Sequence, residues 1–166
     1  MFLKNYTSNV PVSQTIYRIE QVLIKCGVAG IMKDYAIPSG EITSLTFQIE
    51  APSGRITIRL PVDKTRALDA LWVDYVGADK LNVKGDAIES WSSKKKKRRA
   101  DFAEQAHRTA WKIMQDWIEV QMSMIQMKQA DTLQVFLPYV FDGKRSYYQQ
   151  LKEASFRGLL PEKCED

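Results

Sequence analysis

The stretch EITSLTFQIEAPSGRITIRL, residues 41–60, decides the fold class of this chain. Polar and apolar residues alternate along 41–50 and again along 55–60, which is the period of a β-strand. The sequence APSG between the two runs has the composition of a tight turn. Together these features predict a β-hairpin in an antiparallel sheet with one apolar and one solvent-exposed face. The apolar side chains of the two runs are Leu45, Phe47, Ile49, Ile56, Ile58 and Leu60.

The segment before the hairpin predicts a helix over residues 14–26 and then a strand over residues 28–36. Ser13 is a suitable N-cap, and Gly27 is a suitable residue to end the helix. Apolar side chains recur at spacings of three and four, so they share one helix face. They are Ile16, Ile19, Leu23 and Cys26. We expect Cys26 to be buried there as a small hydrophobic residue.

A second helix is predicted over residues 64–76, after the hairpin, with Asp63 as its N-cap. Its apolar side chains are Leu68, Leu71, Trp72 and Tyr75. Residues 13–76 therefore have the order α-β-β-β-α, with helices covering the apolar face of a small three-stranded antiparallel sheet. The fold class that this order predicts is α+β.

Residues 100–160 predict a helical half that packs with the sheet. Its first helix carries an uninterrupted heptad seam: Ala103, Ala106, Ala110, Ile113, Trp117, Val120, Met124 and Met127. Further apolar residues widen this seam: Phe102, Trp111, Met114, Ile118 and Ile125. A helix of about 30 residues is roughly 45 Å long, so it packs across the sheet, across a partner, or both, and a homodimer stays open. One or two short helices follow, the first interrupted near Pro138 and the last over about 147–154, capped by Ser146 after a turn at Asp142-Gly143.

Charge is concentrated in one segment. The chain has 24 basic and 20 acidic residues, a net charge of +4, and six of the basic residues are consecutive. Without Lys94–Arg99, 18 basic residues face 20 acidic ones, a net charge of −2. Attraction to a polyanion is therefore expected only locally. Residues 77–99 have weak periodicity and predict a long basic loop, which is unusual in a compact domain without a functional reason.

The basic loop is the first candidate binding site. Its cations are Lys94, Lys95, Lys96, Lys97, Arg98 and Arg99. Adjacent cations can hold phosphates, with a strong dependence on salt, and Trp91 and Phe102 at the flanks can stack on bases of a single strand. Two other interpretations stay open. The run could be a lysine-rich loop that keeps the following helix soluble, or it could be a nuclear-import signal or another targeting signal.

The polar face of the sheet is the second candidate. Arg55 and Arg59 lie on this face, four residues apart on the same predicted strand. We expect Lys33 from the preceding strand to join them. Such a face can meet a nucleic-acid backbone or an acidic protein. The alternative is that it is only the solvated side of a two-layer structure.

No motif of the chain argues for catalysis, a cofactor or a metal. It has no phosphate-binding glycine loop, nucleophile elbow or zinc-binding helix motif. Glu104-x-x-His107 has the spacing of di-iron bundle proteins, but the chain has no second histidine to complete such a site. Cys26 and Cys164 are too few for a disulfide framework. No segment has the length of a membrane span or of a signal-peptide core. We therefore expect a non-enzymatic, soluble, cytoplasmic protein with one domain over residues 1–166.

Two resemblances add context. The α-β-β-β-α order resembles double-stranded RNA-binding domains, with Lys64 and Arg66 opening the second helix where that family has basic residues. The family's Gly-Pro-x-His motif is absent, so the resemblance concerns topology alone. The second half, RADFAEQAHRTAWKIMQDWIEVQMSMIQMKQADTLQVFLPYVF through DGKRSYYQQL, resembles short uncharacterised proteins of bacteriophages and prophages. In those proteins the helix ends in a motif similar to Phe-Leu-Pro-Tyr, residues 136–139 of this chain. This resemblance implies a non-virion protein of a bacterial host cell that serves DNA metabolism or counters host defence.

Two functions therefore stand as expectations. The first is a nucleic-acid-associated accessory protein of a phage or mobile element that holds DNA or RNA through its basic loop. The second is an interaction protein that inhibits a host defence nuclease, as an anti-CRISPR protein does. The first requires direct, salt-sensitive binding to nucleic acid, whereas the second requires a host protein partner.

Overall fold

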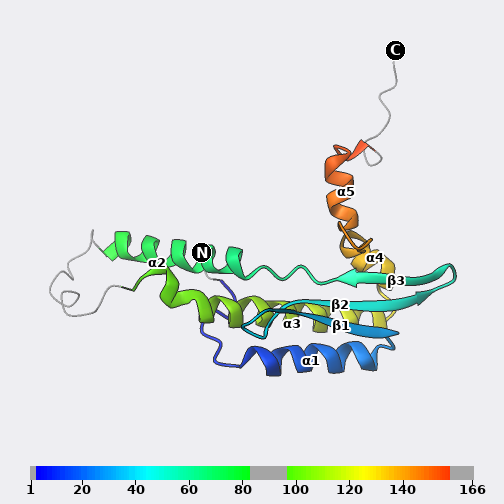
Figure 1. The fold of residues 1–166 in the computed structure, drawn as a ribbon, viewed down its shortest axis with the longest axis horizontal. Helices are drawn as coiled ribbons and strands as arrows, with labels where there is room; N and C mark the ends of the chain where they lie inside the picture. Colours follow the sequence, from blue (N-terminus) through cyan, green and yellow to red (C-terminus); the bar gives the residue numbers. More distant parts are fainter. Residues whose placement is uncertain (1–2, 83–96, 158–166) are drawn as a thin grey trace, which may run out of the picture. The chain divides into compact units, whose positions relative to one another are not determined.

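The computed structural model describes residues 3–82 and 97–157 and confirms the α+β fold class (Figure 1). In chain order the elements are α1 (Val12–Lys25), β1 (Gly30–Ala36), β2 (Glu41–Ala51), β3 (Gly54–Arg59), α2 (Lys64–Asn82), the 3-10 helix η1 (Arg99–Phe102), α3 (Ala103–Gln126), α4 (Thr132–Phe136), the 3-10 helix η2 (Leu137–Tyr139) and α5 (Tyr147–Glu153). The chain forms two compact units, Met1–Ile19 with Val62–Ile118 and Glu20–Pro61 with Glu119–Asp166. The single domain over residues 1–166 stays a prediction.

The sheet of the second unit is antiparallel in the order β1-β2-β3, as the alternating sequence predicted. Ala51 pairs with Gly54, so Pro52 and Ser53 form the tip of the hairpin. Gly54 has a φ of +125°, a backbone conformation that side chains with a Cβ rarely adopt. The turn composition therefore sets the register of β2 on β3.

The apolar face of the sheet holds the core of this unit. Phe47 lies opposite Ile31 on one side and Ile58 on the other, and both Phe47 and Ile58 are fully buried. The ring of Phe136 at the end of α4 meets the Phe47 ring edge-on, with 5.3 Å between the centroids. Phe136 is itself fully buried. Aromatic contacts of this geometry stabilise beyond the area they bury, so α4 is tied firmly to the sheet.

The polar face is less solvated than the alternation predicted. Ser44 and Thr46 alternate with the apolar residues of 41–50 and so belong to the face that was predicted to be solvent-exposed, but both are buried. In register, Thr46 lies between Met32 and Arg59, and Ser44 donates a hydrogen bond to Asp34 beside it. Small side chains between longer neighbours are shielded from water, which the period-2 pattern cannot show.

The outer edge of β3 is partly paired by the segment that follows α4. Val140 forms an antiparallel bridge with Ile58, and Phe141 N–H donates to the carbonyl oxygen of Thr57 at 2.8 Å. The predicted turn then follows, since Asp142 accepts hydrogen bonds from the backbone N–H groups of Lys144 and Arg145, each at 2.7 Å. Ser146 caps α5, as predicted, by accepting from Gln149 N–H.

Helix α1 begins earlier than predicted. Its first residue is Val12, so Ser13 lies inside the helix and is not the N-cap; the carbonyl oxygen of Pro11 accepts from Gln14 and Thr15 N–H instead. The apolar face is confirmed by the buried side chains of Ile16, Ile19 and Leu23. Cys26, expected to be buried, is half-buried just beyond the helix end.

Helix α2 runs to Asn82, so the predicted loop over 77–99 is shorter than expected. Asp63 caps this helix as predicted, accepting from Thr65 and Arg66 N–H at 3.0 Å. A single glycine inside a helix costs only about 1 kcal/mol, which explains why Gly77 does not end it. The remainder of the predicted loop up to residue 96 lies outside the described residues.

Helix α3 buries a different stripe from the predicted heptad seam. Trp111, Met114 and Ile118 are buried, whereas of the seam Ala106 is buried but Val120 and Met127 are exposed. A straight helix has 3.6 residues per turn, so a seam with a period of 3.5 drifts around it by about 20° per heptad. The large buried side chains of α3 therefore include three that were expected only to widen the seam. None of the helices within 3–82 and 97–157 is long and apolar enough to cross a membrane.

In the first unit, the N-terminal segment is held along α3 by side chains one turn apart. Gln105 donates to the Ser8 carbonyl oxygen at 3.1 Å and Thr109 to the Asn5 carbonyl oxygen at 3.3 Å. About two turns further on, Asp116 accepts from Asn5 Nδ2 at 3.0 Å. The segment therefore runs antiparallel to the helix, and we call these contacts the N-terminal clamp.

Candidate nucleic-acid interface

The structure describes the second half of the basic run. Lys97, Arg98 and Arg99 lead directly into η1 and α3, whereas Lys94, Lys95, Lys96 and Trp91 lie outside the described residues. All three described cations contact other side chains of the first unit. Their contacts decide how much charge this half of the run can offer to a ligand.

Arg98 is bound at the start of the helical segment. Its backbone N–H donates to Asp101 Oδ2 at 2.8 Å, and its guanidinium group lies 3.7 Å from Asp101 Oδ1. The side chain is nevertheless 84% exposed. An ion pair in such high dielectric contributes about 0–1 kcal/mol, so an incoming anion can compete for this guanidinium.

Arg99 and Lys97 fasten the basic run to α2. Arg99 forms an ion pair with Asp69, and Lys97 N–H donates to the Tyr75 hydroxyl at 3.2 Å. The Lys97 ammonium lies 5.4 Å from the centroid of the Phe102 ring, a distance at which cations and aromatic faces attract. Two of the three cations are thus held by α2 and by an aromatic ring.

Three aromatic side chains form a cluster beneath this segment. Tyr75 and Phe102 lie 5.1 Å apart between ring centroids, Trp72 and Tyr75 5.7 Å, and Trp72 and Phe102 6.3 Å. All three are half-buried. We call these three residues the aromatic cluster.

The aromatic cluster changes the role expected of Phe102. Its ring packs against Trp72, Tyr75 and Lys97, so only part of its face can receive a base. From the sequence, Trp72 and Tyr75 were assigned to the apolar side of a helix, and their link to the basic run was missed. Their spacing of three residues places them on one face, but nothing local to the sequence shows what that face meets.

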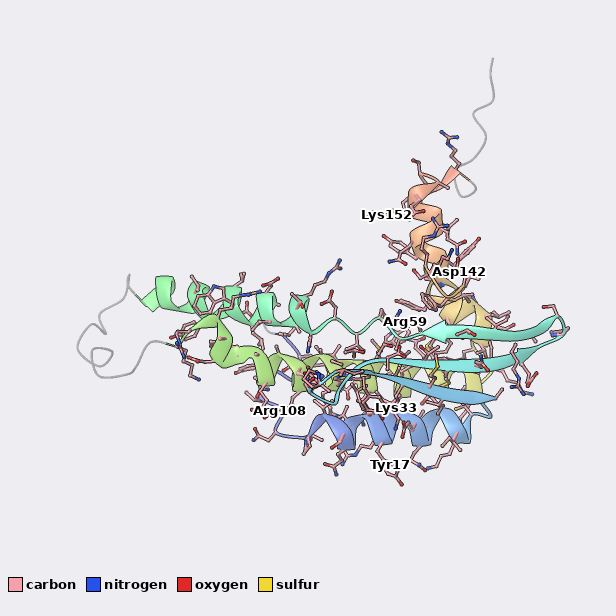
Figure 2. The ribbon with its side chains drawn as sticks, viewed as in Figure 1. Tyr17, Lys33, Arg59, Arg108, Asp142 and Lys152 are labelled. Atoms are coloured by element: carbon pink, nitrogen blue, oxygen red, sulfur yellow. The ribbon has the colours of Figure 1, made fainter. Side chains whose placement is uncertain are left out.

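The sheet arginines share one face, as expected, but each has a carboxylate partner. Arg55 lies directly opposite Glu50, with 3.0 Å between Nε and Oε1. Arg59 lies at the end of β3, 3.8 Å from Asp34 and 5.1 Å from the centroid of the Phe141 ring (Figure 2). Two cations and two carboxylates leave these pairs without net charge, so this face attracts a polyanion weakly.

Lys33 does not join the sheet arginines. It lies opposite Leu45 in the register, which places it on the apolar face, and its ammonium group is 2.7 Å from Glu20 of α1 (Figure 2). The hydrogen bond to Glu20 raises the pKa of Lys33, although burial lowers it. The expectation that Lys33 extends the polar face was therefore wrong. The sequence of β1 does not show which of its residues point to the polar face and which to the apolar face.

Both side chains of the Glu104-x-x-His107 motif contact other residues of α3. Glu104 pairs with Arg108, and the Nε2 atom of His107 accepts a hydrogen bond from the indole N–H of buried Trp111 at 3.0 Å. This bond places the imidazole hydrogen of neutral His107 on Nδ1. Within the described ranges, no three His, Cys, Asp or Glu side chains gather as metal ligands do.

Comparison with known proteins gives no relative. No protein-family model matches the chain, and neither a curated protein nor a solved structure is significantly similar to it.

Proposed function

We propose that this chain is a non-enzymatic accessory protein of a phage or mobile element, and that it binds nucleic acid through the basic run Lys94–Arg99. The observation that carries the proposal is the placement of charge. Six consecutive cations stand in a chain whose other residues carry a net charge of −2. A polyanion is the ligand that such a local concentration favours.

The contacts at the start of α3 support the proposal in two ways. The ion pairs of Arg98 and Arg99 are at least partly exposed, so each can be exchanged for a phosphate contact at small cost. The aromatic cluster holds residues 97–102 against α2. The C-terminal end of the basic run is therefore fixed to the first unit. A cationic segment that is fixed at one end loses less entropy on binding than a free one.

Binding to labelled DNA and RNA, single- and double-stranded, tests the proposal by fluorescence anisotropy across salt concentrations. The wild type is compared with a variant in which Lys94–Arg99 are replaced by Ser and Gln. A control variant, Arg55→Gln with Arg59→Gln, removes two cations that already have carboxylate or aromatic partners. We expect binding that falls steeply with salt, is lost in the first variant and is retained in the second. No binding by the wild type at low salt would refute the proposal.

A protein-binding inhibitor of a host defence nuclease is the second candidate, and one observation favours it. Within the described residues, β1 pairs with β2 alone, and large apolar side chains are exposed along β1 and the turn after it. They are Met32, Tyr35 and Ile37, of which Ile37 is 94% exposed. An apolar edge strand is a template for pairing with another protein. Inhibition of a purified defence nuclease, without any affinity of the chain for nucleic acid, would favour this candidate.

A further inference from the structure

The segment around α5 carries a second group of cations and aromatic rings, separate in sequence from the basic run. Tyr148 is 51% exposed, and its ring lies 6.0 Å from that of Phe156, with 50° between the two planes. Lys152 lies one helical turn after Tyr148 on α5 (Figure 2), and Arg157 follows Phe156 directly. The end of this short helix therefore carries two neighbouring rings and two cations.

The acidic groups of this segment are already engaged elsewhere. Glu153 forms an ion pair with Arg145, and Asp142 accepts from the backbone of the turn and from Gln150 Nε2 at 3.0 Å. The backbone hydrogen bonds from Arg145 and Lys144 keep the pKa of Asp142 below its usual value, so this carboxylate stays ionised. Within the described residues, neither Lys152 nor Arg157 has a carboxylate partner. This contrasts with Arg55, Arg59, Arg98 and Arg99, each of which has one.

The end of α5 holds the Phe156 ring in place at an energetic cost. Ser155 and Phe156 both have a φ of +55°, a left-handed conformation that is uncommon for residues other than glycine. Two backbone hydrogen bonds fix this end, from Ser155 N–H to the Lys152 carbonyl oxygen and from Phe156 N–H to that of Leu151. The result is a ring fixed against Tyr148 at the helix end.

We propose that this end of α5 is a second contact site for a single-stranded nucleic acid, in which an unpaired base stacks on Tyr148 and Lys152 and Arg157 hold the flanking phosphates. An exposed ring with cations near it in the chain fits a polyanion whose planar bases are unstacked, and not a duplex whose bases are covered. The inference rests on the proposed function and deepens it, because it names the strand type and a residue that receives a base.

Binding measurements with matched variants test the inference on the full chain. Tyr148→Ala removes the stacking ring, Tyr148→Phe keeps it, and Lys152→Gln with Arg157→Gln removes both cations. Lys25→Gln, at the exposed end of α1, is the control for loss of one lysine. We expect Tyr148→Ala to weaken binding of a single-stranded oligonucleotide by roughly 5- to 100-fold, with Tyr148→Phe and Lys25→Gln near the wild type. Duplex binding should be unchanged by Tyr148→Ala. The double charge variant should bind more weakly and with a shallower salt dependence.

Photocrosslinking gives a readout that does not depend on how well the variants fold. A single-stranded oligonucleotide with 5-iodouracil is crosslinked to the wild-type chain, and the modified peptide is located by mass spectrometry. A crosslink at Tyr148 or Phe156 supports the inference. A wild type that binds single strands, with crosslinks elsewhere and no effect of Tyr148→Ala, overturns the inference and leaves the proposed function standing. A wild type that binds no nucleic acid overturns both.

Discussion

Asp116 is the centre of the N-terminal clamp, and its replacement by asparagine has a calculable effect. The carboxylate accepts from three donors, Lys4 Nζ at 2.9 Å, Asn5 Nδ2 at 3.0 Å and Lys112 Nζ at 3.1 Å. Burial alone would raise its pKa, but the hydrogen bonds from these three side chains outweigh burial and lower the pKa from 3.8 to about 2. The folded chain therefore favours the charged form.

The lowered pKa sets both the size and the pH range of the effect. The difference between 3.8 and about 2 corresponds to a ceiling of about 2.4 kcal/mol in the free energy of unfolding. Asp116 is 22% exposed and Lys4 is 71% exposed, so solvent screening reduces the contribution to about 1–2 kcal/mol. Because the folded pKa lies below the unfolded one, this stability is fully present above about pH 5 and is lost as the pH falls toward 2.

Urea unfolding followed by circular dichroism, at several pH values between 7 and 2.5, measures this contribution. Asp116→Asn should lower the free energy of unfolding by about 1–2 kcal/mol at pH 7, and its difference from the wild type should shrink as the pH falls. Glu104→Gln is the matched control on the same helix, since that side chain is 84% exposed and pairs with Arg108. A difference for Asp116→Asn that is the same at pH 7 and pH 3 would refute the reasoning.

Three further substitutions test other contacts. Phe136→Ala removes a fully buried ring from the apolar face of the sheet and should cost about 3–5 kcal/mol in urea unfolding, whereas Phe136→Leu should cost much less. His107→Ala deprives the buried Trp111 indole of its acceptor and should cost about 1–3 kcal/mol, so a thermal midpoint equal to the wild type would contradict that bond. Asp69→Asn releases Arg99 and should tighten nucleic-acid binding by about 2- to 5-fold at low salt, and weaker binding in anisotropy would count against the proposed function.

The hairpin and the helix caps could be predicted because their signals are local. Residues 41–60 combine a period of two with turn residues, and the register observed for β2 and β3 follows from that pattern. Asp63 and Ser146 cap their helices through backbone N–H groups only two or three residues away. Such contacts need no knowledge of the tertiary structure.

The N-terminal clamp could not be predicted, since its partners are more than 90 residues apart in sequence. Locally, Asp116 looks like any carboxylate on the polar side of a helix, with Lys112 one turn before it as the only signal. The prediction of which α3 stripe is buried was only partly right, for a related reason. Two apolar stripes overlap along that helix, and tertiary packing decides which of them is buried.

The candidate site shows why counting cations in a sequence overestimates what a ligand can meet. Arg55, Arg59 and Lys33 were expected to form one surface, yet each lies beside a carboxylate, and Lys33 is on the other face. The net charge of a segment is a property of its sequence, but the charge offered to a phosphate is what remains after intramolecular pairing. By that measure, cations such as Lys152, which have no carboxylate beside them in the described part of the chain, attract a polyanion more strongly than the paired arginines of the sheet. The variants at Asp69 and Lys152 test this distinction from opposite directions, since one releases a paired cation and the other removes an unpaired one.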